Sequence, residues 1–238
     1  MFTNSSLINN TILSPNHSGQ RTGKLERLTV HCVVGQLSSE KVANMFLKKS
    51  RKASSNYVIG KDGDVCLVVE ESNRSWCSSS ASNDQKAITI ECASDTTHPY
   101  QFNDVAYNKL IELTVDIMKR NNKNTLVYIS DKEKALKYKV KENELLITFH
   151  RWFAAKSCPG DWFIGQCNNG DFITKVNKHF NNNIKIEEVK KDVIYIVKKG
   201  DTLSKIAKMY NTNYLKIARD NKIANPSLIR VGQKLIIK

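Results

Sequence analysis

A polar, charge-dense segment near residue 183 divides the chain and limits each part to a fold of its own. Three consecutive asparagines, at 181–183, precede a run from 185 to 192 that is rich in lysine, glutamate and aspartate. Such a composition suits a linker, because it offers too little apolar surface to form a core. We therefore expect a large domain at residues 1–182, a linker at 183–194 and a small domain at 195–238.

In the large domain, apolar runs of strand length alternate with segments of helical periodicity. Asp62-Gly63 between two of the runs predicts a tight hairpin turn. Residues 1–24 are polar and irregular, so we expect them to form an arm over the surface. The pattern favours an α/β fold with a mixed central sheet flanked by helices. We expect strands at 28–31, 56–59, 65–69 and 87–92, and helices at 38–50, 103–120 and 171–180.

The small domain has the pattern of a β-α-α-β unit in about 44 residues. A short apolar run at 195–197 predicts the first strand, and 231–237 predicts the last. Between them, apolar side chains at 203, 206, 207 and 210 follow helical spacing, and a second short helix covers 214–220. Gly200-Asp201-Thr202 forms the turn that caps the first of these helices.

The formal net charge is +14, and residues 183–238 hold 13 basic and 5 acidic side chains, more than half of the excess. Such a charge favours an anionic partner: nucleic acid, a membrane surface or an anionic cell-wall polymer. Proteins that bind single-stranded nucleic acid interleave aromatic with basic residues. The chain lacks that pattern, so we expect no nucleic-acid partner.

Three sequence features indicate in which cellular compartment the protein is expected. No stretch approaches the roughly 20 apolar residues that cross a membrane, so we expect no transmembrane segment. The first six residues lack the basic and apolar regions of a signal peptide, so we expect the protein to stay in the cytoplasm unless another route releases it. The six cysteines then favour reduced thiols over a disulfide framework.

His150 and Cys158 lie eight residues apart, and a Pro-Gly turn follows the cysteine directly. Zinc binds neutral imidazole and thiolate, and a catalytic site needs three protein ligands with one position left open. His31, at the end of an apolar run, is the best candidate for the third ligand. The alternative, which spacing alone leaves open, is a core histidine beside an ordinary buried cysteine.

The small domain resembles the LysM domain over its whole length. The resemblance is carried by Tyr195-x-Val197-x-x-Gly200-Asp201-Thr202-Leu203, by Asn225-Pro226-x-x-Ile229 and by Val231-Gly232-Gln233-x-Leu235. It implies binding to glycans that contain N-acetylglucosamine, chiefly peptidoglycan and chitin. The same loops also make turns and cap helices, and both roles are compatible. The implied glycan contacts are Gly200, Asp201, Thr202, Leu203, Asn225, Pro226 and Ile229.

The large domain resembles the zinc-dependent N-acetylmuramoyl-L-alanine amidase family, which includes peptidoglycan recognition proteins and phage lysins. The resemblance covers residues 25–180. It is carried by Leu28-Thr29-Val30-His31, Asn56-Tyr57-Val58-Ile59-Gly60, Trp76-Cys77-Ser78-Ser79-Ser80, Ala87-Ile88-Thr89-Ile90-Glu91 and the segment from His150 to Cys158-Pro159-Gly160.

This resemblance implies a role for each matching residue. His31, His150 and Cys158 match the Zn²⁺ ligands, and Glu91 matches the general base. Lys156 matches the residue that stabilises the oxyanion. Taken alone, Glu91 would be a surface carboxylate or the partner of a buried base, and Lys156 a solvated surface lysine. The chain has Asn56 where many members have histidine; Tyr57 and Trp76 are candidates for the substrate groove.

Together the two resemblances imply an enzyme that hydrolyses the amide between N-acetylmuramic acid and L-alanine of peptidoglycan, acting as an endolysin. Two alternatives stay open: a bacterial autolysin, and a non-catalytic peptidoglycan receptor.

Overall fold

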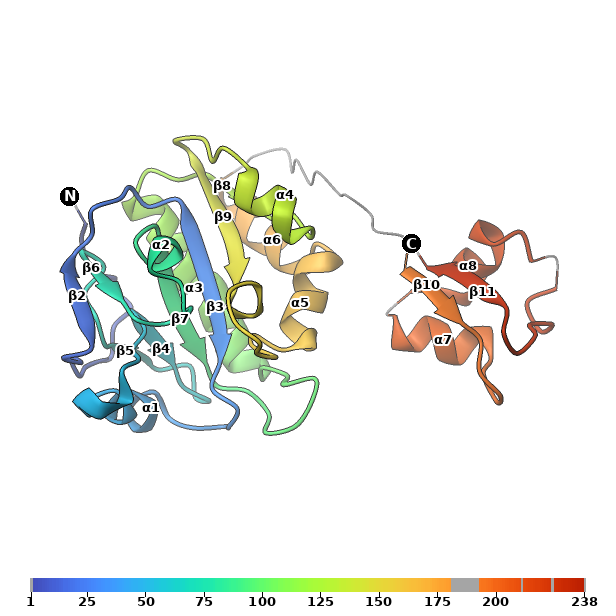
Figure 1. Cartoon of the computed structure of the whole chain (residues 1–238), viewed down its shortest axis with the longest axis horizontal. Coiled ribbons are helices and arrows are strands. Elements are labelled where there is room, and N and C mark those ends of the chain that lie inside the picture. Colours follow the sequence, from blue (N-terminus) through green and yellow to red (C-terminus); the bar gives the residue numbers. More distant parts are fainter. Residues whose placement is uncertain (1, 181–192, 211, 224, 238) are drawn as a thin grey trace. The chain divides into compact units, whose positions relative to one another are not determined.

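Two units of the chain each form a core of their own, at Met1–Glu187 and Glu188–Lys238. The computed structural model describes residues 2–180, 193–210, 212–223 and 225–237 (Figure 1). The expected linker at 183–194 therefore lies outside the described residues, apart from its last two positions.

A seven-stranded mixed sheet forms the centre of the first unit, in the order β1-β5-β4-β7-β3-β9-β8. The β4–β5 pair is antiparallel, and the other neighbours run parallel. Gly63, at φ +83°, makes the predicted hairpin turn between β4 and β5, since this conformation costs glycine little. The strands are β1 Asn10–Thr11, β3 Arg27–Cys32, β4 Tyr57–Ile59, β5 Val65–Leu67, β7 Ala87–Cys92, β8 Thr125–Val127 and β9 Glu144–Phe149.

Helices cover both faces of this sheet, which confirms the predicted α/β fold (Figure 1). The longest helix, α3, packs on one face with α5 and α6, over a core that includes Val30 and Ile90. Helix α1 packs on the other face, against Val58 and Cys66. The helices are α1 Ser39–Met45, α2 Ala81–Asp84, α3 Asp104–Arg120, α4 Lys132–Lys137, α5 Asp161–Asn168 and α6 Asp171–Asn177.

The alternation of side chains along β3 and β7 separates core from site. Val30 and Ile90 belong to the core with α3. Their neighbours His31 and Glu91 must point to the opposite face, because successive side chains of a strand alternate. His31 and Glu91 are register partners across the parallel pair β3–β7. Since β3, β7 and β9 run parallel, their carboxyl ends share one edge of the sheet, where ligands bind in open α/β folds.

The N-terminal arm is more regular than we expected. Strand β1 pairs with β5, and β2 (His17–Gln20) pairs with β6 (Asn73–Ser75). The edge of β5 offers unpaired backbone groups, and the arm satisfies them, a constraint that its polar sequence does not reveal.

The second unit confirms the predicted β-α-α-β order. Strands β10 (Val193–Ile196) and β11 (Lys234–Ile237) form an antiparallel pair. Helices α7 (Leu203–Met209) and α8 (Tyr214–Asp220) lie between them in the chain. Strand β10 begins two residues before the expected domain boundary, because Val193 already pairs with the last described residue of β11.

Candidate metal and catalytic site

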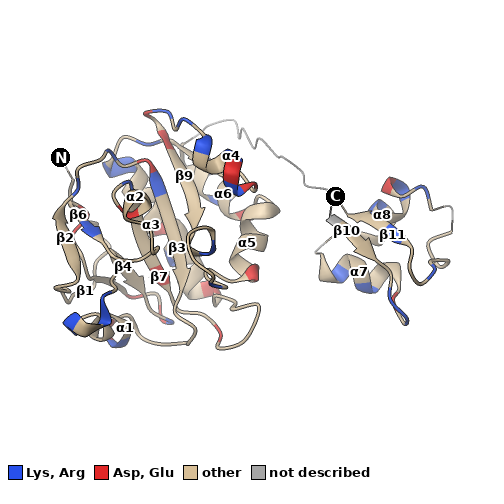
Figure 2. Cartoon of the chain, in the orientation of Figure 1, with Lys and Arg blue, Asp and Glu red and all other residues tan. Residues whose placement is uncertain are grey.

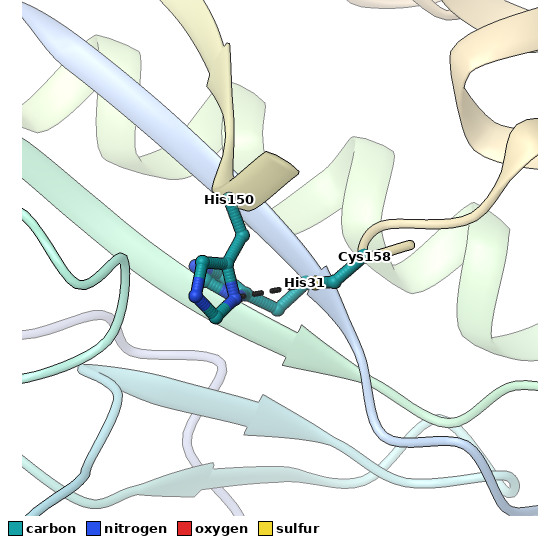
Figure 3. A group of neighbouring side chains, drawn as sticks. All are labelled: His31, His150 and Cys158. Carbon is teal, nitrogen blue, oxygen red and sulfur yellow. Dashed lines mark hydrogen bonds between the residues drawn. The ribbon is translucent and has the colours of Figure 1, made fainter. Parts of the chain in front are cut away.

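Three side chains with metal-binding atoms meet at the edge where the parallel strands end (Figure 3). His31 lies near the end of β3, His150 directly follows β9, and Cys158 lies on the loop after it. Their ligand atoms all lie within 4.8 Å of one another. His31 Nδ1 is 3.3 Å from Cys158 Sγ. The structure thus brings together the three residues that the sequence predicts as ligands.

The electrostatics of these groups suit a metal ion. Burial, with a smaller contribution from His150, holds the pKa of His31 well below its usual range. Burial and then Lys156 lower the pKa of His150. Both imidazoles are therefore neutral at pH 7, the form that coordinates metals.

The thiol of Cys158 needs a cation to ionise. Burial raises its pKa well above the usual range. The backbone N–H of Cys32 donates to Sγ over 3.4 Å, which favours the thiolate once a cation is present. Two neutral imidazoles and one thiol form a donor set that zinc prefers, so the residues present fit this metal.

Glu91 lies beside the same triad. Its carboxylate, the thiol of Cys77 and a ring nitrogen of His31 also fall within 4.8 Å of one another. Burial, and then the charge of Cys32, raise the pKa of Glu91 to about 8, against a smaller opposing effect of Arg51. A cation close by would favour the carboxylate form. The structure therefore places the predicted general base next to the predicted ligands.

Lys156 is exposed on the loop between His150 and Cys158. Its charge is one of the causes that lower the pKa of His150, so its ammonium group acts on the site.

The loop that follows β6 contributes residues that the sequence argument did not single out. Ser79 Oγ lies 3.1 Å from His150 Nε2. Ser79 has φ +62°, a left-handed conformation that is uncommon outside glycine and is often found at functional sites. The sequence motif contains Ser79, but no pattern in it connects this serine to a histidine 71 residues away.

Buried Asp84 holds this loop in place. Its carboxylate accepts hydrogen bonds from Cys77 N at 3.0 Å, from Ser78 N at 3.2 Å and from Ser78 Oγ at 2.5 Å. Cys77 and Ser79 therefore approach the site from a loop with a defined backbone.

Tyr57 is not in a substrate groove, which corrects our expectation. It is completely buried, and its hydroxyl donates to Glu71 Oε1 at 2.7 Å while accepting from Ser5 N. On its short strand the side chain faces the core with α3 rather than the site. Asn56 is also buried and accepts a hydrogen bond from Thr89 N, so its role is structural.

Trp76, the other groove candidate, is half-buried. Its indole N–H donates to Ser18 Oγ at 2.6 Å, and its backbone N–H donates to Ser54 Oγ. It lies one residue before Cys77, so it remains a candidate for contact with substrate.

In the second unit, the first loop predicted to bind glycan uses its side chains to hold itself together. Asp201 Oδ2 accepts from the hydroxyl of Tyr195 at 2.6 Å, and Thr202 Oγ1 caps α7. Leu203 is 2% exposed and belongs to the core, so its side chain is not available to a ligand. Gly200 is exposed at φ +87°.

The second predicted glycan loop is more open. Asn225 is exposed, and its Oδ1 accepts from Ser227 N at 3.0 Å. Pro226 and Ile229 are half-buried, and Ile229 packs against the core of this unit. Both loops thus combine turn-forming hydrogen bonds with exposed residues, Gly200 in the first and Asn225 in the second.

Among the described residues, no helix has both the length and the apolar character of a membrane span.

Comparison with known proteins places both units in families. The family model of N-acetylmuramoyl-L-alanine amidase matches residues 21–161, and that of the LysM domain matches residues 195–238. The solved structure of PlyL shares the fold, with a TM-score of 0.50 and 16% identity over 70% of this chain and 95% of that chain.

Two curated relatives match over shorter segments. An uncharacterized protein of Deinococcus radiodurans is 55% identical over 49 residues, 19% of this chain and 19% of its own length. The cortical fragment-lytic enzyme of Bacillus subtilis is 50% identical over 44 residues, 18% of this chain and 10% of its own length. The amidase model, in contrast, spans more than half of the chain and contains His31, Glu91, His150 and Cys158, so the chain belongs to the N-acetylmuramoyl-L-alanine amidase family.

Proposed function

We propose that the chain is a zinc-dependent amidase that hydrolyses the bond between the lactyl group of N-acetylmuramic acid and L-alanine in peptidoglycan. One observation carries this proposal: His31, His150 and Cys158 converge at the carboxyl edge of the sheet, with Glu91 alongside. Membership of the amidase family supports the reaction type.

His31, His150 and Cys158 would hold the zinc ion. When bound there, zinc would act as a Lewis acid and lower the pKa of water toward about 7. Glu91 would accept the proton of the attacking water and return it to the amide nitrogen of L-alanine as the C–N bond breaks. Lys156 would offset the negative charge that develops on the carbonyl oxygen in the transition state.

The second unit would anchor the enzyme to the wall through the glycan strands. A tethered binding module raises the effective concentration of the catalytic unit on an insoluble polymer. Lysines and arginines occur on both units (Figure 2), and the net charge of +14 suits a wall that carries anionic polymers.

Digestion of purified Gram-positive cell walls, followed by mass spectrometry of the released ends, tests the activity. Free stem peptides that begin with L-alanine, with the glycan strands intact, are the expected products. Binding of the zinc-loaded protein without any cleavage would contradict the proposal and favour the non-catalytic receptor.

The role of a phage endolysin, which reaches the wall through a membrane lesion made by a separate protein, belongs to the same proposal. The gene neighbourhood tests it. A holin-like gene beside this one would support the endolysin, and a neighbourhood of peptidoglycan-synthesis genes would favour an autolysin.

A further inference from the structure

We propose that His31, Cys77 and Glu91 form a second metal-binding site, which takes a thiophilic divalent cation such as Zn²⁺, Co²⁺ or Cd²⁺ as an alternative to the His31–His150–Cys158 site. The three side chains offer imidazole, thiol and carboxylate, the three kinds of protein ligand that zinc uses. Their ligand atoms lie within 4.8 Å of one another, the same limit that the first triad meets.

Two buried atoms in this cluster lack a hydrogen-bond partner among the described residues. One is Nε2 of His31, a residue that is only 1% exposed, and the other is Oε2 of Glu91. Nearly all buried polar atoms in folded proteins have a partner, so two unpartnered atoms in one cluster need an explanation. A cation that this cluster holds through these two atoms would satisfy both.

The two ring nitrogens of His31 have different surroundings. Nδ1 lies 3.3 Å from Cys158 Sγ, on the side of the first triad. Nε2 is the atom without a partner. A neutral imidazole offers one lone pair for coordination, so His31 can serve one ion at a time. The two sites are therefore alternatives, and the second becomes available when the first loses a ligand.

Cys77 is well placed for this role. Its backbone is held by Asp84, and its Sγ lies 4.0 Å from Glu91 Oε1. A tetrahedral zinc ion with bonds of roughly 2.0–2.3 Å holds its ligand atoms about 3.5 Å apart. Small side-chain rotations would therefore bring these three groups to coordination distance.

Co²⁺ titration of the full-length apoprotein tests the proposal, because cobalt–thiolate coordination gives a charge-transfer band in the near ultraviolet. Cys158→Ser should retain a thiolate band from Cys77, and the double variant with Cys77→Ser should lose it. The matched control is Cys158→Ser with Cys66→Ser, which should keep the band, because Cys66 lies in the separate core under α1. A folded Cys158→Ser variant without a band would overturn the proposal, as would a band that survives in the Cys77 double variant.

A second measurement covers the case in which Cys158→Ser does not fold. In a His150→Ala variant, excess Cd²⁺ should slow alkylation of half-buried Cys77 by iodoacetamide at least tenfold, as mapped by mass spectrometry. Equal rates at Cys77 with and without Cd²⁺ would refute the second site. Both measurements report metal binding alone, so their outcome does not depend on whether the chain cleaves peptidoglycan.

Discussion

The two units differ in how their polar site residues are satisfied. In the first unit, His31 Nε2 and Glu91 Oε2 are buried and have no hydrogen-bond partner within the described part of the chain. In the second unit, Asp201, Thr202 and Asn225 all accept hydrogen bonds from groups of the same unit. Unsatisfied buried groups indicate a site that needs a ligand to be complete, whereas satisfied loops indicate a preformed surface. The first unit therefore suits chemistry, and the second suits attachment.

Loss of His31, the ligand that both metal-binding triads share, should separate the two units most clearly, because it should abolish catalysis and leave wall binding intact. His31→Ala removes a donor from both metal-binding triads, so we expect it to lose bound metal and to reduce amidase turnover to background. Binding to cell walls should persist, since it depends on the second unit. Metal analysis, turnover of wall fragments and a wall pull-down check these outcomes, with Cys66→Ala as the control. A His31→Ala protein that keeps zinc and full activity would refute the assignment.

The Glu91→Gln variant separates metal binding from proton transfer. The amide is similar in size but cannot accept a proton, so turnover should fall by about 10²–10⁴-fold, the usual contribution of a general base. Zinc bound at His31, His150 and Cys158 should remain. Measurement of kcat and metal content on one preparation distinguishes a general base from a metal ligand. Loss of metal together with activity would make Glu91 a metal ligand instead.

Deletion of residues 183–238 tests the other side of the comparison. The first unit has its own core, so the shortened protein should fold and cleave small soluble fragments at close to the full-length rate. Affinity for intact walls should fall by at least about 10²-fold, because the tethering gain is lost. Parallel assays on soluble fragments and on whole walls measure how much more the deletion weakens action on walls than on fragments. Equal losses on both substrates would mean that the second unit contributes to catalysis rather than attachment.

Lys156→Met should have a smaller effect on turnover. Methionine keeps most of the length of the side chain but removes the charge, so kcat should fall by about 10²-fold if the ammonium group stabilises the transition state. KM and metal content should change little. Lys137, an exposed lysine on α4, provides the matched control as Lys137→Met. An unchanged kcat would make Lys156 an ordinary surface residue.

The sequence predicted those parts of the molecule that obey a regular period. The 17-residue helix α3, with Asn103 as its N-cap, follows from apolar spacing and a capping residue. The convergence of His31, Glu91 and His150 follows from three strands that end next to these residues, once the strands are known to run parallel. Local pattern and tertiary structure agree at these places.

The failures arise where tertiary contacts decide. We predicted Tyr57 as a groove residue because it lies in a family motif. In the structure its hydroxyl donates a hydrogen bond to Glu71, which is 14 residues further along the chain. Strands β1 and β2 have no apolar alternation and exist because they pair with β5 and β6. The contact of Ser79 with His150 occurs where Ser79 has a left-handed backbone conformation. A serine in the sequence does not predict this conformation.

A tyrosine–aspartate hydrogen bond occurs in each unit. Its removal gives the smallest of the predicted effects, a change in the stability of that unit at acid pH. Hydrogen bonds from Lys175 and Tyr107 hold the pKa of Asp171 below its usual value, although burial opposes the shift. The hydroxyl of Tyr195, and then a backbone N–H, lower the pKa of Asp201. Each carboxylate therefore binds protons less readily in the folded than in the unfolded chain.

The stabilisation from such a group is fully present above the unfolded pKa of about 3.9 and is lost as the pH falls through the lower folded value. We expect both units to lose stability below about pH 4, with two separate transitions in calorimetry. Asp171→Asn should weaken that acid dependence in the first unit only, and Asp201→Asn in the second only, each with a change of a few degrees in melting temperature. A shift of both transitions by either variant would show that the units are coupled, contrary to a catalyst and an anchor that fold independently.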